Sequence, residues 1–163
     1  MFETATENEK NYNYVLMEQH SFFRPTPKER AKIKAAFDKI DIIVYGNGYD
    51  LIDKKTKENI DNLDEIINEV NLYELKTHSK ETKYEIDEYF NGFSFGITMN
   101  EIRNSCSLGE KFKMIYLNSK TNSIKIQEFK EIEKDFSHAS YFFRVGCKPK
   151  VFTLNGVIDT VEV

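Results

Sequence analysis

Strand character is clearest in the stretch Asn71-Leu72-Tyr73-Glu74-Leu75-Lys76-Thr77, where apolar and charged residues alternate. Because residues two apart in a β-strand project from the same face, Glu74 and Lys76 are predicted to point together while Tyr73 and Leu75 pack behind. A carboxylate and an ammonium group on one strand face need either a partner or a function. This stretch therefore anchors the prediction of both the fold and a candidate site.

An amphipathic helix is predicted upstream, over residues 28–40. Ile33, Phe37 and Ile40 recur at helical spacing, the lysines take the opposite face, and Thr26 or Pro27 begins the helix. The first 24 residues have neither helical nor strand periodicity, so residues 1–26 are predicted to form an N-terminal extension.

A strand, a tight turn and a second strand are predicted to follow this helix. Residues 41–45 are β-branched and apolar, residues 46–48 are Gly-Asn-Gly, and residues 49–53 contain Asp50. Residues 54–70 are charged, with apolar residues at helical spacing, and this pattern predicts a short helix or ordered insertion before the strand that carries Glu74.

The pattern after residue 78 predicts a further helix and several strands. The sequence Thr98-Met99-Asn100-Glu101 forms a capping box, which predicts a helix to about Ser107 with Gly109 as its C-cap. Strands are predicted where apolar residues alternate or cluster, at residues 89–97, 111–117, 124–126 and 141–145, with a charged segment at 131–135. The predicted organisation is one domain over residues 1–163, with a core at 27–118 and additional strands in 119–163.

Composition sets limits on the class of protein. The chain has 163 residues, of which 40% are hydrophobic and 31% charged, a profile typical of one globular α/β domain. The formal charge of -4 provides no global positive field for nucleic acid, so any basic binding surface has to be local. Cys106 and Cys147 stand in no metal-binding motif and are interpreted as reduced thiols. With no signal-peptide-like or membrane-spanning apolar run, a cytoplasmic location is expected.

Asp50, Glu74 and Lys76 form the candidate catalytic site. If the strand bearing Asp50 neighbours the strand bearing Glu74 and Lys76, two carboxylates and one lysine converge at the edge of a small mixed sheet. Two carboxylates suit Mg²⁺, which leaves its other positions to water and phosphate oxygens, and the backbone carbonyl of Leu75 could complete the metal shell. The predicted metal ligands are therefore Asp50, Glu74 and Leu75.

The order of these elements resembles the αβββαβ core of the PD-(D/E)XK nuclease superfamily, the restriction-endonuclease-like fold. More narrowly, residues 72–77, 95–102 and 112–117, together with Gly109, resemble the No Vein C-terminal and Mrr-like restriction endonuclease type of domain. The resemblance covers roughly residues 29–118. It implies a Mg²⁺-dependent, or Mn²⁺-dependent, DNA endonuclease related to restriction or phage defence, which acts as a homodimer or with a larger restriction or helicase partner.

The sequence departs from the superfamily pattern at two places. Tyr49 stands where a proline is expected, and 24 positions separate Asp50 from Glu74, a gap that an insertion at residues 54–70 would explain. Asp53, Asp61 or Asp64 could instead supply the first carboxylate, and this alternative stays open on sequence alone.

Some of these acidic residues, and the chain as a whole, also have interpretations that involve no catalysis. Glu101 is sufficiently explained by the capping box, and Glu29 by a surface position on the first helix. The main functional alternative is a non-catalytic domain of the same fold that binds nucleic acid or protein and keeps Glu74 and Lys76 as an ion pair. A weaker alternative is an anti-restriction protein whose acidic surface mimics DNA.

Overall fold

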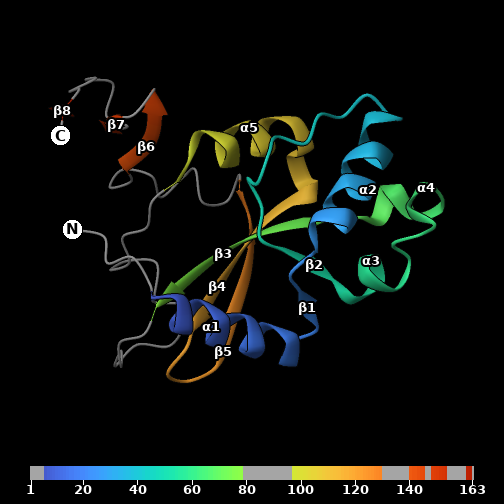
Figure 1. Ribbon diagram of the computed structural model, residues 1–163, viewed down its shortest axis with the longest axis horizontal. Helices are drawn as coiled ribbons and strands as arrows, with labels where there is room; N and C mark the ends of the chain where they lie inside the picture. Colours follow the sequence, from blue (N-terminus) through green and yellow to red (C-terminus); the bar gives the residue numbers. More distant parts are fainter. Residues whose placement is uncertain (1–5, 79–96, 130–139, 146–147, 154–160, 163) are drawn as a thin grey trace.

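The computed structural model describes residues 6–78, 97–129, 140–145, 148–153 and 161–162 of the chain. Within these residues, the larger sheet has five strands in the order β1-β2-β3-β4-β5. They are β1 (Phe22–Phe23), β2 (Leu51–Asp53), β3 (Leu72–His78), β4 (Phe112–Asn118) and β5 (Ser123–Glu128). Strands β3 and β4 are parallel, and every other neighbouring pair is antiparallel. The chain is thus a mixed α/β structure, as predicted (Figure 1).

The N-terminal region contains a helix and a strand. The prediction that the first 24 residues lack regular secondary structure is therefore wrong. Helix α1 (Glu7–Gln19) begins at a capping box formed by Thr6 and Glu9, and β1 follows it. The sequence signal is weak because α1 buries only a narrow stripe, chiefly Leu16 and Met17, while the rest of the helix is polar. Tertiary packing rather than amphipathic periodicity stabilises this helix.

The predicted helix over 28–40 is confirmed as α2 (Pro27–Asp38). Thr26 is its N-cap: the threonine side chain accepts a hydrogen bond from the Glu29 backbone, and the Glu29 side chain accepts one from the Thr26 backbone. Ile33 and Phe37 are fully buried. Proline at the first helical position contributes because its missing N–H would have no partner there.

The predicted strand at residues 41–45 is wrong, since residues 42–45 have no regular secondary structure. The Asn104 side chain replaces a neighbouring strand: its Oδ1 accepts a hydrogen bond from the Tyr45 N–H at 2.7 Å and its Nδ2 donates one to the Tyr45 carbonyl at 3.2 Å. Val44 is buried in the core. The apolar segment is therefore buried only in part, since Ile43 is exposed, and a side-chain amide satisfies the Tyr45 backbone that a neighbouring strand was expected to satisfy.

The insertion predicted at residues 54–70 is confirmed as three short helices. These are α3 (Lys54–Glu58), α4 (Leu63–Ile66) and the 3₁₀ helix η1 (Ile67–Glu69). Leu63, Ile67 and Val70 from this segment enter the core.

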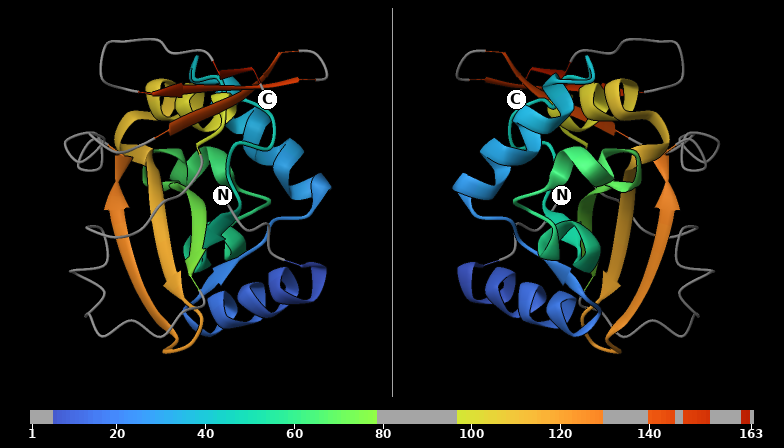
Figure 2. Two further views of the ribbon diagram at one scale, coloured as in Figure 1. Left: turned by 90° about the vertical axis from the view of Figure 1, so that its left-hand side faces the viewer. Right: turned by 90° about the vertical axis from the view of Figure 1, so that its right-hand side faces the viewer.

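Helices cover both faces of the larger sheet (Figures 1 and 2). One face packs against α2, the α3–α4 insertion and α5 (Met99–Leu108), with Leu72, Met114 and Tyr116 at its centre. The other face packs against α1 through Tyr73 and Ile115. This alternation along β3 and β4 matches the predicted strand periodicity. It also assigns Glu74 and Lys76, which follow Leu72 at two-residue spacing, to the α5 face.

A second sheet of three antiparallel strands lies toward the C-terminus. Its strands are β6 (Ser140–Val145), β7 (Lys148–Thr153) and β8 (Val161–Glu162). Strands β5 and β6 confirm the strands predicted near 124–126 and 141–145. The predictions for residues 89–96 and 131–135 lie outside the described residues, and the single-domain organisation stays a prediction.

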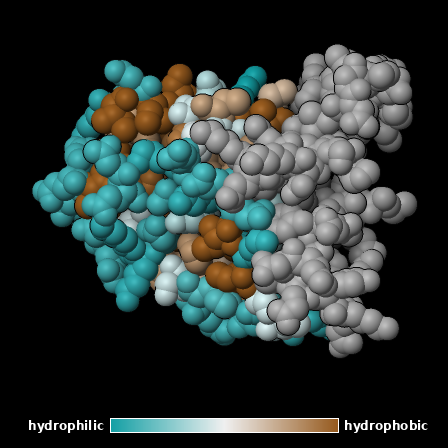
Figure 3. Space-filling model, turned by 180° about the vertical axis from the view of Figure 1, so that it is seen from behind, coloured by the Kyte–Doolittle hydropathy of each residue, from teal (hydrophilic) through white to brown (hydrophobic). Residues whose placement is uncertain are grey.

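The described surface in Figure 3 is largely hydrophilic, with smaller apolar patches between the polar residues. Large apolar side chains are exposed at Tyr12 and Val15 on α1 and at Ile43 before β2. Within the described part of the chain, no helix combines the length and the apolar character needed to cross a membrane.

Candidate functional site

Strand β3 places Glu74 and Lys76 side by side, as its periodicity predicts. Lys76 Nζ donates a hydrogen bond to Glu74 Oε1 at 2.9 Å. Glu74 is only 6% exposed, and the Lys76 side chain only 12%. Solvated edge-strand charges would be far more exposed, so the pair occupies an interior position that costs free energy unless each charge has partners.

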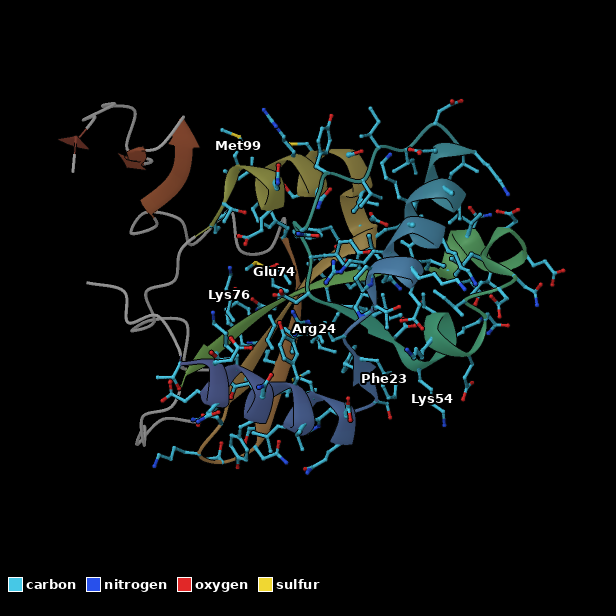
Figure 4. All side chains as sticks on the ribbon, in the orientation of Figure 1. Phe23, Arg24, Lys54, Glu74, Lys76 and Met99 are labelled. Atoms are coloured by element: carbon cyan, nitrogen blue, oxygen red, sulfur yellow. The ribbon has the colours of Figure 1, made fainter. Side chains whose placement is uncertain are left out.

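Asp50 lies at the edge of β3, immediately before the start of β2. Its backbone N–H donates to the Tyr73 carbonyl at 2.8 Å, and its Oδ2 accepts a hydrogen bond from the Leu75 N–H at 3.0 Å. The carboxyl groups of Asp50 and Glu74 are close enough that each influences the pKa of the other. Asp50, Glu74 and Lys76 therefore come together in one cluster, of which Figure 4 labels Glu74 and Lys76.

The three alternative aspartates have other partners. Asp53 is the N-cap of α3, where it accepts a hydrogen bond from the Thr56 N–H at 2.8 Å, and its second oxygen accepts from the Tyr73 hydroxyl. Asp61 and Asp64 form exposed ion pairs with lysines of the α2 region. Of the four aspartates considered, Asp50 is the one whose carboxylate meets the Glu74 side chain.

Glu101 is the site residue that sequence reasoning missed. The capping box is confirmed, because Glu101 Oε2 accepts a hydrogen bond from the Thr98 N–H at 2.8 Å. The same oxygen also accepts from Lys76 Nζ at 3.2 Å, and Glu101 is 6% exposed. One carboxylate thus caps α5 and holds the lysine. The order of elements could have indicated this role. Helix α5 connects the parallel strands β3 and β4, and such a connecting helix packs on one face of the sheet, here the face that carries Glu74.

Glu29, predicted to be a surface charge on the first helix, is separate from the cluster. It completes the capping box of α2 and forms an ion pair with Lys57 at 2.7 Å. Its side chain is 16% exposed, so it is a partly shielded surface charge with a structural role.

Close packing against α5 fixes the loop that delivers Asp50. A Cβ atom on Gly48 would lie 2.6 Å from the Asn104 Nδ2 and 2.8 Å from the Asn100 carbonyl oxygen, so only glycine fits. Tyr49, at the expected proline position, is buried at 2% exposure. The Arg30 guanidinium stacks 4.5 Å from its ring centroid and donates to its carbonyl at 2.9 Å. Burial and these two contacts position the residue before Asp50.

Burial raises the pKa of both the Asp50 and the Glu74 carboxyl group. Burial raises the pKa of Glu74 well above its usual range; the Lys76 ammonium opposes this rise, and the nearby Asp50 and Glu101 carboxylates reinforce it. Burial also raises the pKa of Asp50, against the hydrogen bond from the Leu75 N–H and the charge of Lys76. A proton is therefore held at Glu74 more readily than at an exposed glutamate.

Lys76 stays charged despite its burial. Burial alone would lower the pKa of its ammonium group, but the Glu74, Glu101 and Asp50 carboxylates outweigh that effect and raise the pKa above its usual range. Three carboxyl groups thus surround one ammonium group. When all are ionised, the cluster carries an excess of negative charge.

The cluster is a limited metal-binding set. Within the described ranges, no three His, Cys, Asp or Glu side chains are arranged to hold a metal ion. The predicted metal ligands comprise two carboxylate side chains and the Leu75 carbonyl. The Glu101 carboxylate already accepts hydrogen bonds from Thr98 and Lys76. The chemistry available at the site is therefore a carboxylate pair beside a fixed positive charge.

Comparison with family models found no match, and comparisons with curated proteins and with solved structures found no significant match.

Proposed function

We propose that this protein is a Mg²⁺-dependent DNA endonuclease of the PD-(D/E)XK type. The observation that carries the proposal is the proximity of the Asp50 and Glu74 carboxyl groups beside Lys76, at the edge of β3 and immediately before the start of β2. Acid, acid and lysine in this chain order and on these strands are what phosphodiester hydrolysis by such enzymes needs.

The charge of the cluster supports a divalent cation there. Three carboxyl groups against one ammonium leave buried negative charge uncompensated, which is costly unless the carboxyls take up protons or a cation binds. Mg²⁺ is usually held by one or two carboxylates, with water and phosphate oxygens as its other ligands. Because the N–H and C=O of a strand residue point to the same side, the Leu75 carbonyl faces the edge where its N–H meets Asp50. Asp50, Glu74 and Leu75 would hold the ion.

Each residue then has a chemical role. A bound Mg²⁺ or Mn²⁺ supplies Lewis acidity toward the scissile phosphate and lowers the pKa of a coordinated water. Lys76 provides a fixed positive charge where negative charge develops on the phosphate oxygens, and its burial strengthens that effect. Glu101 acts through Lys76, since its carboxylate accepts a hydrogen bond from the same ammonium group as Glu74.

The order of elements supports the restriction-endonuclease-like core as part of the proposal. Helix α2, strands β2 and β3, helix α5 and strand β4 follow the expected order, and β3 and β4 are parallel around the crossover. The element that departs is the predicted strand at 41–45, whose place is taken by a loop. The partners proposed with this fold are DNA, a second copy of the chain or a restriction or helicase protein, in the cytoplasm.

A non-catalytic binding domain is the second candidate, and one observation favours it. Lys76 has two carboxylate partners, Glu74 at 2.9 Å and Glu101 at 3.2 Å, so its charge is paired without any ligand. Such a network can persist for structural reasons alone.

Cleavage of DNA distinguishes the two candidates. Supercoiled and linear DNA would be incubated with wild type, Glu74→Ala, Lys76→Ala and the control Lys54→Ala, each with Mg²⁺, Mn²⁺ or chelator. Lys54 lies far from the cluster (Figure 4) and pairs with Glu58. We expect metal-dependent cutting by wild type and Lys54→Ala and its loss in the other two variants. Absence of cutting by wild type, with tight DNA or protein binding retained, would favour the non-catalytic domain.

A further inference from the structure

Arg24 lies beside the candidate site on the side opposite α5. It directly follows β1, in which Phe23 is paired with Ile52 of β2. Because the two strands are antiparallel, the chain at Arg24 runs alongside the segment from which Asp50 enters β2. Figure 4 shows the labelled Arg24 between α1 and β3, near Glu74 and Lys76.

Tyr14 of α1 holds the Arg24 side chain in place. The guanidinium carbon lies 4.8 Å from the centroid of the Tyr14 ring, within the range of a cation–π interaction. Burial raises the pKa of the Tyr14 hydroxyl, the Asp50 and Glu74 carboxylates raise it further, and Arg24 opposes them. Tyr14 therefore lies within electrostatic range of Arg24 and of both candidate metal ligands.

The Arg24 side chain is exposed and has no carboxylate partner within the described part of the chain. Several lysines of the surrounding surface do have one, among them Lys57 and Lys55. A guanidinium stacked flat on a ring keeps its N–H donors free at its edge, in a fixed fork that matches a phosphate group. Among the described residues, Arg24 is thus a set of oriented N–H donors without a carboxylate acceptor.

An anionic substrate needs such a group at this site. The carboxylates of Asp50, Glu74 and Glu101 repel an approaching phosphodiester, and Lys76 is already engaged by two of them. A further cation beside the cluster would offset this repulsion. Arg24 is exposed, and the Tyr14 ring orients its guanidinium group.

We propose that Arg24, stacked on Tyr14, binds a phosphate of the nucleic-acid backbone next to the scissile phosphate. The inference rests on the proposed nuclease function, since it assigns the substrate contact of the same site. The contact is to the phosphodiester group, so it carries no base-sequence preference.

The test is the salt dependence of DNA binding. Fluorescence anisotropy of a labelled DNA duplex, with Ca²⁺ in place of Mg²⁺, would compare wild type with Arg24→Gln and the control Lys54→Gln, after thermal unfolding has verified that each is folded. Loss of one phosphate contact is expected to lower the slope of log K against log salt by about 0.9 and to weaken binding about eightfold at about 0.1 M salt. Lys54→Gln is expected to match wild type.

Two Tyr14 variants test the stacking. Tyr14→Phe keeps the ring and is expected to bind DNA as wild type does, whereas Tyr14→Leu removes the ring face and is expected to weaken binding in the same direction as Arg24→Gln. Equal binding by Tyr14→Leu and wild type would overturn the role assigned to the stack.

The outcomes separate this inference from the nuclease proposal. Weakened binding by Arg24→Gln in a protein that cuts no DNA supports the phosphate contact and overturns the nuclease. Unchanged affinity and salt slope in Arg24→Gln overturn the contact, even if wild type cuts DNA in a Lys76-dependent way. Failure of wild type to bind any DNA overturns both.

Discussion

Glu74 is the residue on which the chemistry of the site most depends. It is buried, its neighbours Asp50 and Glu101 are also acidic, and among the described residues Lys76 is the positive charge in hydrogen-bonding contact with it. Without a cation, such a carboxyl group is more stable protonated than ionised. In the protein without a bound cation, loss of the Glu74 proton therefore lowers the free energy of unfolding.

This cost predicts a pH dependence of stability in the presence of chelator. Because the folded-state pKa of Glu74 is raised above its ordinary value of 4.5, the folded state binds more protons than the unfolded state between those two pKa values. The free energy of unfolding is highest below the unfolded-state pKa and falls as pH rises through the folded-state pKa, by about 1.4 kcal/mol for each unit of the shift.

Glu74→Gln tests this prediction, since the amide cannot ionise. Urea unfolding of wild type and Glu74→Gln would be measured with chelator at several values between pH 4 and pH 9. We expect the variant to lose less stability than wild type as pH rises. Parallel losses in the two proteins would contradict the assignment of the raised pKa to Glu74.

Sequence reasoning at the residue scale predicted some site residues and missed others for identifiable reasons. Strand periodicity is local, so the shared face of Glu74 and Lys76 could be predicted. The choice of Asp50 over Asp53 depends on which carboxylate reaches the β3 backbone, and that is a tertiary contact. Glu101 was missed because the capping box was enough to explain a glutamate at this position. The sequence does not show that the same carboxylate oxygen also contacts Lys76.

At the scale of elements, α5 links the site to the rest of the fold. Its first turn supplies Glu101 to Lys76, and Asn104, one turn later, binds the backbone of Tyr45 in the loop that leads to Asp50. The capping box itself is not special to this helix, since α1 and α2 begin with the same Thr-x-x-Glu arrangement. The three helices therefore provide a matched comparison.

Glu101→Gln is expected to separate capping from positioning. The amide oxygen can still accept a hydrogen bond from the Thr98 N–H, so stability should fall by no more than about 1 kcal/mol, as for a weakened cap. The negative charge that holds Lys76 is lost, so the rate of DNA cleavage should fall with little change in DNA affinity. Steady-state kinetics and thermal unfolding would be measured together.

Glu9→Gln is the control for this prediction. Glu9 occupies the equivalent capping-box position on α1, is exposed, and contacts Thr6. It should reproduce the small stability change without a change in cleavage rate. An equal loss of activity in Glu9→Gln and Glu101→Gln would mean that capping alone explains both.

At the scale of the whole molecule, helices on both faces enclose the sheet, and the α1 face was the one that sequence could not predict. Alternation in β3 and β4 requires a cover on each face, because Tyr73 and Ile115 are buried on one face and Leu72 and Met114 on the other. The cover is largely polar in sequence, since α1 contributes only a narrow buried stripe. The strand predicted at residues 41–45 was wrong for the converse reason. Val44 is buried there, but the Asn104 side chain, and not a neighbouring strand, binds the Tyr45 backbone.

The importance of α1 can be measured by a single truncation. Met17 is fully buried against this second face, so Met17→Ala is expected to lower the free energy of unfolding by about 2–5 kcal/mol. Val15, on the same helix and 53% exposed, is the control, and Val15→Ala should change stability by no more than about 0.5 kcal/mol. Equal, small effects in urea unfolding would show that α1 does not close the core.

Asp50 and Glu74 are proposed to form a cation site beside Lys76. Titration of Mn²⁺ into wild type, Asp50→Asn and the control Asp53→Asn, followed by calorimetry, tests this proposal, because Asp53 lies close in sequence but caps α3. We expect Mn²⁺ binding by wild type and Asp53→Asn and its loss in Asp50→Asn. Equal binding by all three proteins, or none by wild type, would contradict it.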